Sequence, residues 1–225
     1  AAGYKTVDGT TSITGISQSG DLQTLVTNCN GGTVKLLQNV DIGSQSLVIA
    51  AESSLNLDLN GKTLSGRDCK RDSMGYQVIG PVIFNKGALT LYSSVNVKGT
   101  IKLTDTATSN WSDWGTILNI ATITRMENVR LEADAVCNRV WAYCGEDNNM
   151  DGQGIVLGDV INCEFVSNAG GAFYTYEGTS LGTIKDSTFV GKTSAITLSN
   201  IPVTAIENCT LTATDGTALK LTSGT

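Results

Sequence analysis

A six-residue pattern recurs along the second half of the chain and constrains the fold more than any other feature. Each copy has an asparagine or aspartate at its third position, an apolar residue two positions earlier and another three positions later. The copies start at residues 126, 160, 184 and 206, which are 34, 24 and 22 residues apart. Such a repeat is typical of a chain that winds into stacked units. The shared polar positions are Asn128, Asn162, Asp186 and Asn208.

A second repeated segment runs in phase with the first. Gly171, Ser194 and Thr217 each precede an alanine in a short, mostly apolar segment, and they lie 23 residues apart. Residues 55–59 and 88–91 alternate apolar and polar side chains, which is typical of a half-buried strand. Each period therefore contains at least two short strands.

A period of about 22 to 24 residues without an intervening helix predicts an all-β parallel solenoid. Each coil would pair its backbone with the coils above and below, about 4.8 Å away. The repeated Asx position fits a tight corner, because these residues tolerate the left-handed backbone region and bond to nearby backbone. The signature of leucine-rich repeats and the period of helical repeats are both missing.

Residues 55–66, Leu-Asn-Leu-Asp-Leu-Asn-Gly-Lys-Thr-Leu-Ser-Gly, resemble the first full coil of proteins in the pectate-lyase-like superfamily, and the later Asn-Cys-Thr-Leu coil resembles their later turns. The resemblance covers roughly residues 30–225 and implies a right-handed, single-stranded parallel β-helix. It implies no single activity, because that superfamily includes lyases, hydrolases, bacterial surface adhesins and phage fibre proteins.

The two ends of the chain differ in sequence. Residues 19–29 predict a short amphipathic helix with Leu22, Leu25, Val26 and Cys29 on one face. We expect residues 1–30 to cap the N-terminal end of a β-helix formed by residues 31–225. The last strand-like segment, 218–221, has no such cap, so we expect further chain, a second subunit or an end-to-end contact to cover it.

Composition excludes several classes of function. The chain has no histidine, which rules out a Ser-His-Asp or Cys-His mechanism and imidazole ligands for zinc. Fifteen Lys and Arg against 21 Asp and Glu give a net charge of -6, which argues against nucleic-acid binding. No apolar run is long enough to span a membrane. Because the sequence starts at Ala-Ala-Gly without a methionine, we expect a leader to have been removed.

Three insertions interrupt the repeat, at residues 66–80, 104–115 and 133–153, and we expect function to reside there. Aromatic side chains on loops beside a rigid scaffold stack on sugar rings or anchor a protein partner. The alternative is that they only pack the loops onto the solenoid wall. The candidate ligand-binding residues are Trp111, Trp114, Trp141, Tyr143 and Tyr76.

The six cysteines are considered as three pairs. Cys163 and Cys209 occupy one column of the repeat two coils apart, too far for a disulfide, so we expect buried thiols. Cys137 and Cys144 flank a short segment of the third insertion that can close as a hairpin, which favours a disulfide. A weaker hypothesis pairs Cys29 with Cys69, and the alternative is free thiols. A loop disulfide would indicate an oxidising, extracellular setting.

A partial calcium-loop motif follows Cys144. Asp147, Asn149 and Asp151 place oxygen ligands at every second residue before Gly152, as in the first half of an EF-hand loop. The twelfth position is a glycine, with Asp159 and Glu146 as candidate substitutes. The motif therefore predicts either a calcium site or an ordinary solvated turn.

The leading functional hypothesis is a non-catalytic, extracellular or cell-surface β-helix module that binds a glycan or a surface protein through the insertions. One alternative is a virion fibre or decoration protein with the same fold. The other is a polysaccharide lyase, a class that resembles this chain in fold and uses clustered aspartates for calcium and an arginine or lysine as base. Arg130 and Arg139 lie nearest to the acidic loop in sequence.

Overall fold

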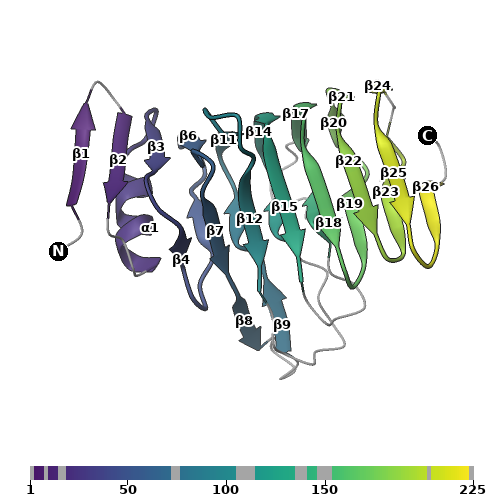
Figure 1. Cartoon of the computed structure of the whole chain (residues 1–225), viewed down its shortest axis with the longest axis horizontal. Helices are drawn as coiled ribbons and strands as arrows, with labels where there is room; N and C mark the ends of the chain where they lie inside the picture. Colours follow the sequence, from purple (N-terminus) through teal and green to yellow (C-terminus); the bar gives the residue numbers. More distant parts are fainter. Residues whose placement is uncertain are drawn as a thin grey trace.

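The computed structural model describes residues 3–7, 10–14, 19–71, 77–104, 115–134, 141–145, 154–201 and 204–222. Within these ranges the chain forms three parallel β-sheets, and successive strands pass from one sheet to the next in a repeating order (Figure 1). Each passage through the three sheets makes one coil. The predicted parallel β-solenoid is therefore confirmed.

Sheet A contains β1 (Gly3–Val7), β2 (Thr10–Thr14), β3 (Thr33–Leu36), β6 (Ser54–Asp58), β11 (Ala88–Tyr92), β14 (Thr122–Glu127), β17 (Val156–Ile161), β20 (Ser180–Leu181), β21 (Thr183–Lys185) and β24 (Ala205–Glu207). Sheet B contains β4 (Val40–Asp41), β7 (Thr63–Gly66), β12 (Gly99–Leu103), β15 (Val129–Ala133), β18 (Glu164–Ser167), β22 (Thr188–Gly191) and β25 (Thr210–Ala213). Sheet C contains β5 (Leu47–Ile49), β10 (Ile83–Asn85), β13 (Ile117–Asn119), β16 (Tyr143–Gly145), β19 (Gly171–Thr175), β23 (Ser194–Ser199) and β26 (Thr217–Thr222).

The repeated sequence positions lie in register. Met126 of β14 is aligned with Val160, which is aligned with Ile184 of the next coil. Gly171 is aligned with Ser194, and Ser194 with Thr217. Both repeats inferred from the sequence therefore correspond to ladders of stacked strands.

The core is a set of apolar ladders inside the coils. Alternating positions of the strands are buried, so each strand contributes one face to the interior. Aromatic rings fill the later coils, where Phe165 stacks on Phe189 at 4.7 Å between ring centroids and Phe173 meets both edge-on. Stacking like side chains on successive coils stabilises the register as well as the core.

The Asx corners between sheets A and B adopt the predicted left-handed conformation. Asn128, Asn162, Asp186 and Asn208 have φ values of 56°, 52°, 52° and 50°. Asn162 Nδ2 donates to Asn128 Oδ1 at 3.2 Å, and Asn208 donates to Asp186. The corners therefore stack along the solenoid and bond to one another.

A second polar ladder, which the sequence analysis did not identify, runs inside sheet C. Asn85 and Asn119 are fully buried, and Asn85 Nδ2 donates to Asn119 Oδ1 at 2.8 Å. Asn119 Nδ2 also donates to the hydroxyl of Tyr143 at 3.4 Å, which continues the ladder into the next coil. These hydrogen bonds compensate for burying the amides.

The N-terminal end of the solenoid is covered. Helix α1 (Ser19–Asn28) buries Leu22, Leu25 and Val26, and Cys29 just after the helix is buried with them, so the predicted capping face is confirmed. The antiparallel β1–β2 hairpin extends sheet A beyond β3. The side chain of Gln23 bonds to the backbone of edge strand β5, accepting from Val48 N at 2.8 Å and donating to Val48 O at 3.0 Å.

The last described coil, β24 to β26, lies at the other end of the molecule from β1 (Figure 1). Its core-facing side chains remain exposed, at 41% for Leu219 and 51% for Leu221. Within the described ranges, no further strand pairs with the outer edges of these three strands.

Candidate functional site

The structure describes three of the candidate site residues chosen from the sequence: Trp141, Tyr143 and Cys144. The other candidates lie outside the described residues, and their roles stay predictions. These are the ligand-binding candidates Trp111, Trp114 and Tyr76, the calcium-loop residues Asp147, Asn149 and Asp151, and Cys137.

The insertions leave the solenoid at one corner. The first follows β7 and contains the antiparallel hairpin of β8 (Asp68–Arg71) and β9 (Gln77–Gly80), which projects from the coils (Figure 1). The second lies between β12 and β13, and the third begins after β15. All three therefore start at the corner between sheets B and C, in consecutive coils.

The third insertion is divided by a regular strand. Within the predicted range 133–153, β16 pairs in parallel with β13 on one side and β19 on the other. In the sequence, the residues before β16 connect sheet B to sheet C, and the calcium-loop motif comes between β16 and β17 of sheet A.

Tyr143 is a core side chain, which corrects its assignment to a ligand-binding surface. It is fully buried, and its ring stacks on that of Phe173 at 4.9 Å between centroids. Burial raises the pKa of its hydroxyl well above the ordinary value, and the hydrogen bond from Asn119 opposes that shift only partly. No ligand outside the solenoid can stack on this ring.

Trp141, two residues before Tyr143, is partly exposed and belongs to an aromatic cluster. Its ring centroid is 4.8 Å from that of Tyr174 in β19, with the planes inclined at 36°. Tyr174 in turn lies 6.3 Å from Tyr176, whose side chain is 42% exposed. We call these three residues the aromatic surface.

Tyr174 and Tyr176 were missed in the sequence analysis because Tyr174 belongs to repeat strand β19 and Tyr176 directly follows it, so neither lies in an insertion. The signal was present, since side chains two residues apart on a strand lie on the same face. Phe173 and Thr175, the intervening positions, are buried, so Tyr174 lies on the outer face of sheet C.

Gly171 fixes the position of the Trp141 ring. A Cβ atom built on Gly171 would lie 1.7 Å from Cζ3 of Trp141, which no real contact allows. The indole therefore packs directly on the backbone of β19. The absence of a side chain at this position is what allows the ring to lie there.

Hydrogen-bonding groups flank the aromatic surface. Tyr176 starts a tight turn in which its carbonyl accepts from Thr179 Oγ1 at 2.8 Å and Gly178 has a φ of 86°. Next to it, Glu177 Oε1 accepts from Asn200 Nδ2 of the following coil at 2.7 Å. Carboxylate and amide groups thus lie beside an exposed ring.

Sheet B carries an ion-pair network on its outer face. Glu132 accepts from Lys102 Nζ at 2.8 Å and from Arg130 Nε at 3.0 Å, and Arg130 also pairs with Glu164. Burial opposes the charge on Glu132, but these bonds hold its pKa below the ordinary value. Hydrogen bonds to Glu164 and Glu132 outweigh partial burial and raise the pKa of Arg130.

Cys163 and Cys209 are free thiols, but of the two only Cys163 is buried as expected, and Cys209 in the last described coil is partly exposed. Burial raises the pKa of Cys163 to about 12, so it stays protonated and unreactive. No disulfide joins any two of the cysteines whose side chains the structure describes, Cys29, Cys144, Cys163 and Cys209. The Cys137–Cys144 disulfide remains a prediction because Cys137 lies outside the described residues, and so does the Cys29–Cys69 pairing because the side chain of Cys69 does.

Within the described ranges, no group of three or more acidic or cysteine side chains is arranged to hold a metal ion. In the same ranges, no helix has the length and apolar character needed to cross a membrane. Comparison of the chain with models of known families, with curated proteins and with solved structures finds no match.

Proposed function

We propose that this protein is a non-catalytic, extracellular β-helix module that binds a glycan on the outer face of sheet C. The observation that carries the proposal is the aromatic surface, where rings from two adjacent coils lie together and Tyr176 remains exposed. Sugar rings present apolar C–H faces that pack on aromatic side chains. The stacked coils provide a rigid support that lowers the entropic cost of binding.

The polar neighbours of the aromatic surface fit the same ligand. Glycan hydroxyl groups need both donors and acceptors, and Glu177 and Asn200 supply them beside Tyr176. A site with an apolar platform and a few directed polar groups is typical of small-ligand recognition. The extracellular setting rests on the predicted Cys137–Cys144 disulfide, which would need an oxidising environment.

The lyase alternative needs an arginine or lysine that releases its proton. Arg130, the described candidate, is paired with Glu132 and Glu164, and these partners favour its charged form. A guanidinium held in this way is a poor base. This pairing supports a binding module over a lyase.

A glycan array tests the proposal with matched variants. Tyr176→Ala and Tyr174→Ala remove the rings, and we expect each to lower the affinity for the bound glycan at least 10-fold. Phe84→Ala is the control, since Phe84 lies on the same face of sheet C three coils away and is also partly exposed. If no glycan on a broad array binds, or if both tyrosine variants bind as tightly as the native protein, the proposal is wrong.

A second variant displaces a ring without removing it. In Gly171→Ala the new methyl group occupies the space of the Trp141 ring, so the indole must move off β19. We expect a red shift of the tryptophan fluorescence that is absent when Trp141→Phe is made in the same background, together with weaker glycan binding. Unchanged binding after a confirmed displacement of the ring would show that Trp141 does not contribute.

A further inference from the structure

The corner between sheets A and B is longest in one coil, between β11 and β12. From β14 onwards this corner spans one or two residues and contains one left-handed Asx residue, but between β11 and β12 it is the loop 93–98. The loop exposes Val95 and Val97, at 39% and 65%. The corners between these sheets in the two earlier coils, 37–39 and 59–62, are shorter, so the six-residue loop needs a physical explanation.

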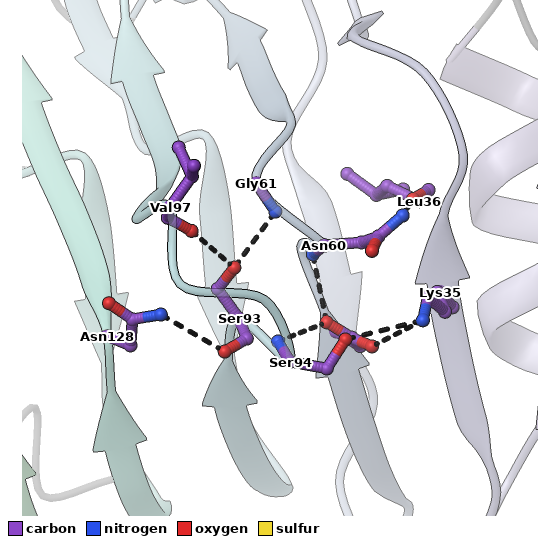
Figure 2. Close-up of polar contacts among 9 residues, drawn as sticks. Lys35, Leu36, Asn60, Gly61, Ser93, Ser94, Val97 and Asn128 are labelled. Carbon is purple, nitrogen blue, oxygen red and sulfur yellow. Dashed lines mark hydrogen bonds and ion pairs between the residues drawn. The ribbon is translucent and has the colours of Figure 1, made fainter.

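The loop is held by both neighbouring coils rather than left free. Figure 2 shows Ser93 between Gly61 and Val97: its Oγ accepts from Gly61 N and donates to Val97 O, both at 2.8 Å. From the other side, Asn128 Nδ2 donates to Ser93 O at 3.2 Å and to Val95 O at 2.6 Å. These bonds preorganise the loop.

A buried carboxylate supports the base of the loop. Asp58 is 3% exposed, and its Oδ1 accepts from Asn60 N at 2.8 Å and from Ser94 N at 3.0 Å. Lys35 lies 3.6 Å from the other oxygen and donates to Ser94 Oγ at 3.3 Å (Figure 2). The charge of Asp58 is therefore balanced inside the protein and is not directed at a ligand.

Beside this loop lies a pocket of about 560 Å³, which we call the corner pocket. Its volume is within the range of small-ligand sites, roughly 300–1,000 Å³. Its lining combines one aromatic ring with amides, hydroxyls and a carboxylate. The lining residues are Tyr92, Ser93, Ser94, Val95, Asn96, Glu127, Asn128 and Asn162.

The groups left for a ligand define its chemistry. Asn96 is exposed and forms no hydrogen bond with any described residue, and Glu127 uses only Oε2 in its ion pair with Arg125. Lys98 Nζ donates to Asn162 Oδ1 at 2.9 Å, but Lys98 is not part of the lining. An anionic ligand would face the carboxylate of Glu127 without a free cation in the lining, whereas neutral hydroxyl groups can bond to both the carboxylate and the amide.

We propose that the corner pocket binds one neutral pyranose unit, with its apolar face on Tyr92 and its hydroxyl groups on Asn96 and Glu127. The site is separate from the aromatic surface. It lies at the corner of sheets A and B, whereas the aromatic surface is on the outer face of sheet C. The protein would then hold a glycan at two places, or two different glycans.

Saturation-transfer NMR tests this proposal with single sugars. The probes are the methyl glycosides of glucose, galactose and mannose and N-acetylglucosamine, with glucuronate as the anionic comparison. We expect at least one neutral sugar to receive saturation, and Asn96→Ala and Tyr92→Ala each to weaken its binding at least fivefold. Val97→Ala is the matched control, because Val97 is on the same loop but is not part of the lining.

Each outcome is decisive for this pocket. No transfer to any neutral sugar, equal binding by Asn96→Ala and Tyr92→Ala, or stronger binding of glucuronate would overturn the proposal. Tyr176→Ala separates the two sites, since we expect it to leave this signal unchanged. If the signal is lost in Tyr176→Ala and kept in Asn96→Ala, the sugar binds at the aromatic surface, and only the corner pocket is excluded.

Discussion

At the scale of single residues, the backbone conformation of the corners between sheets A and B restricts which residue types can occupy them. Each corner from β14 onwards requires a φ near +50°, a conformation that costs most L-residues about 1 kcal/mol or more. Asparagine and aspartate accept it, and their side chains then bond to the corner of the next coil. The same residue type therefore tolerates the left-handed backbone conformation and forms hydrogen bonds between coils.

Replacing Asp186 separates these two contributions. Asp186→Ala keeps the strained φ and loses the acceptor for Asn208, so we expect the free energy of unfolding to fall by about 2 kcal/mol. Asp186→Gly loses the acceptor but relieves the backbone, and we expect it to lose only about half as much. Urea unfolding measures both. A glycine variant less stable than the alanine variant would contradict this account of the corner.

The ion pairs of Glu132 predict a loss of stability in acid. The folded state holds the pKa of Glu132 below its ordinary value of 4.5, so its contribution is complete above that pH and is lost as the pH falls through the folded pKa. We expect the unfolding free energy of Glu132→Gln to be about 1 kcal/mol lower than that of the native protein at pH 7. Near pH 3 we expect this difference between the two proteins to be smaller. A difference that grows in acid would show that Glu132 does not act in this way.

At the scale of elements, the edge strand of a sheet needs partners for its unpaired backbone groups. Strand β5 is the N-terminal edge of sheet C, and the amide of Gln23 takes the place of a neighbouring strand there. An open edge is a template for association with another chain. The side chain of Gln23 on α1 therefore satisfies backbone hydrogen-bonding groups of β5 that have no neighbouring strand on this side.

Amide hydrogen exchange tests this role of Gln23. In Gln23→Ala the N–H of Val48 loses its acceptor, and we expect its exchange to become at least 10-fold faster while amides of β6 and β7 are unaffected. Thr24→Ala is a control on the same helix. Equal protection of Val48 in the native protein and Gln23→Ala would mean that another group closes the edge.

The elements also show how far sequence reasoning reached. The repeats predicted the coils and the Asx corners, and the amphipathic pattern of residues 19–29 predicted the capping helix, because each pattern extends over enough residues to be recognised. The three-residue strand β16 was hidden inside an insertion, since a strand of that length shows almost no alternation, and Tyr143 was therefore placed on the surface. Tyr174 and Tyr176 were overlooked because binding residues were expected only in the insertions, whereas Tyr174 lies on the outer face of β19 and Tyr176 directly follows that strand.

At the scale of the whole molecule, the two ends of the described solenoid are unequal. Core residues of the middle coils are fully buried, whereas Leu219 and Leu221 of the last described coil are about half exposed. In a repeat protein each coil is stabilised mainly by its neighbours, so a coil with one neighbour is less stable than one with two. Stability should therefore decrease along the axis towards β26.

Hydrogen exchange resolved by strand measures that gradient. We expect amides of β24, β25 and β26 to exchange fastest, and those of β12, β15 and β18 to exchange at the rate set by global unfolding. Phe165 of β18, whose buried ring packs against the rings of Phe173 and Phe189, lies in the slow region. Uniform protection from β12 to β26 would contradict a coil-by-coil description and would indicate one cooperative unit.

The most direct test of the central claim is amide chemical-shift mapping with a glycan that the array identifies. We predict that the perturbed amides cluster on β16, β19 and the turn after it, around Trp141, Tyr174 and Tyr176, and that Tyr176→Ala abolishes the perturbations. Perturbations confined to other surfaces, with the amides of β16 and β19 unchanged at saturating glycan, would show that the outer face of sheet C is not the binding surface.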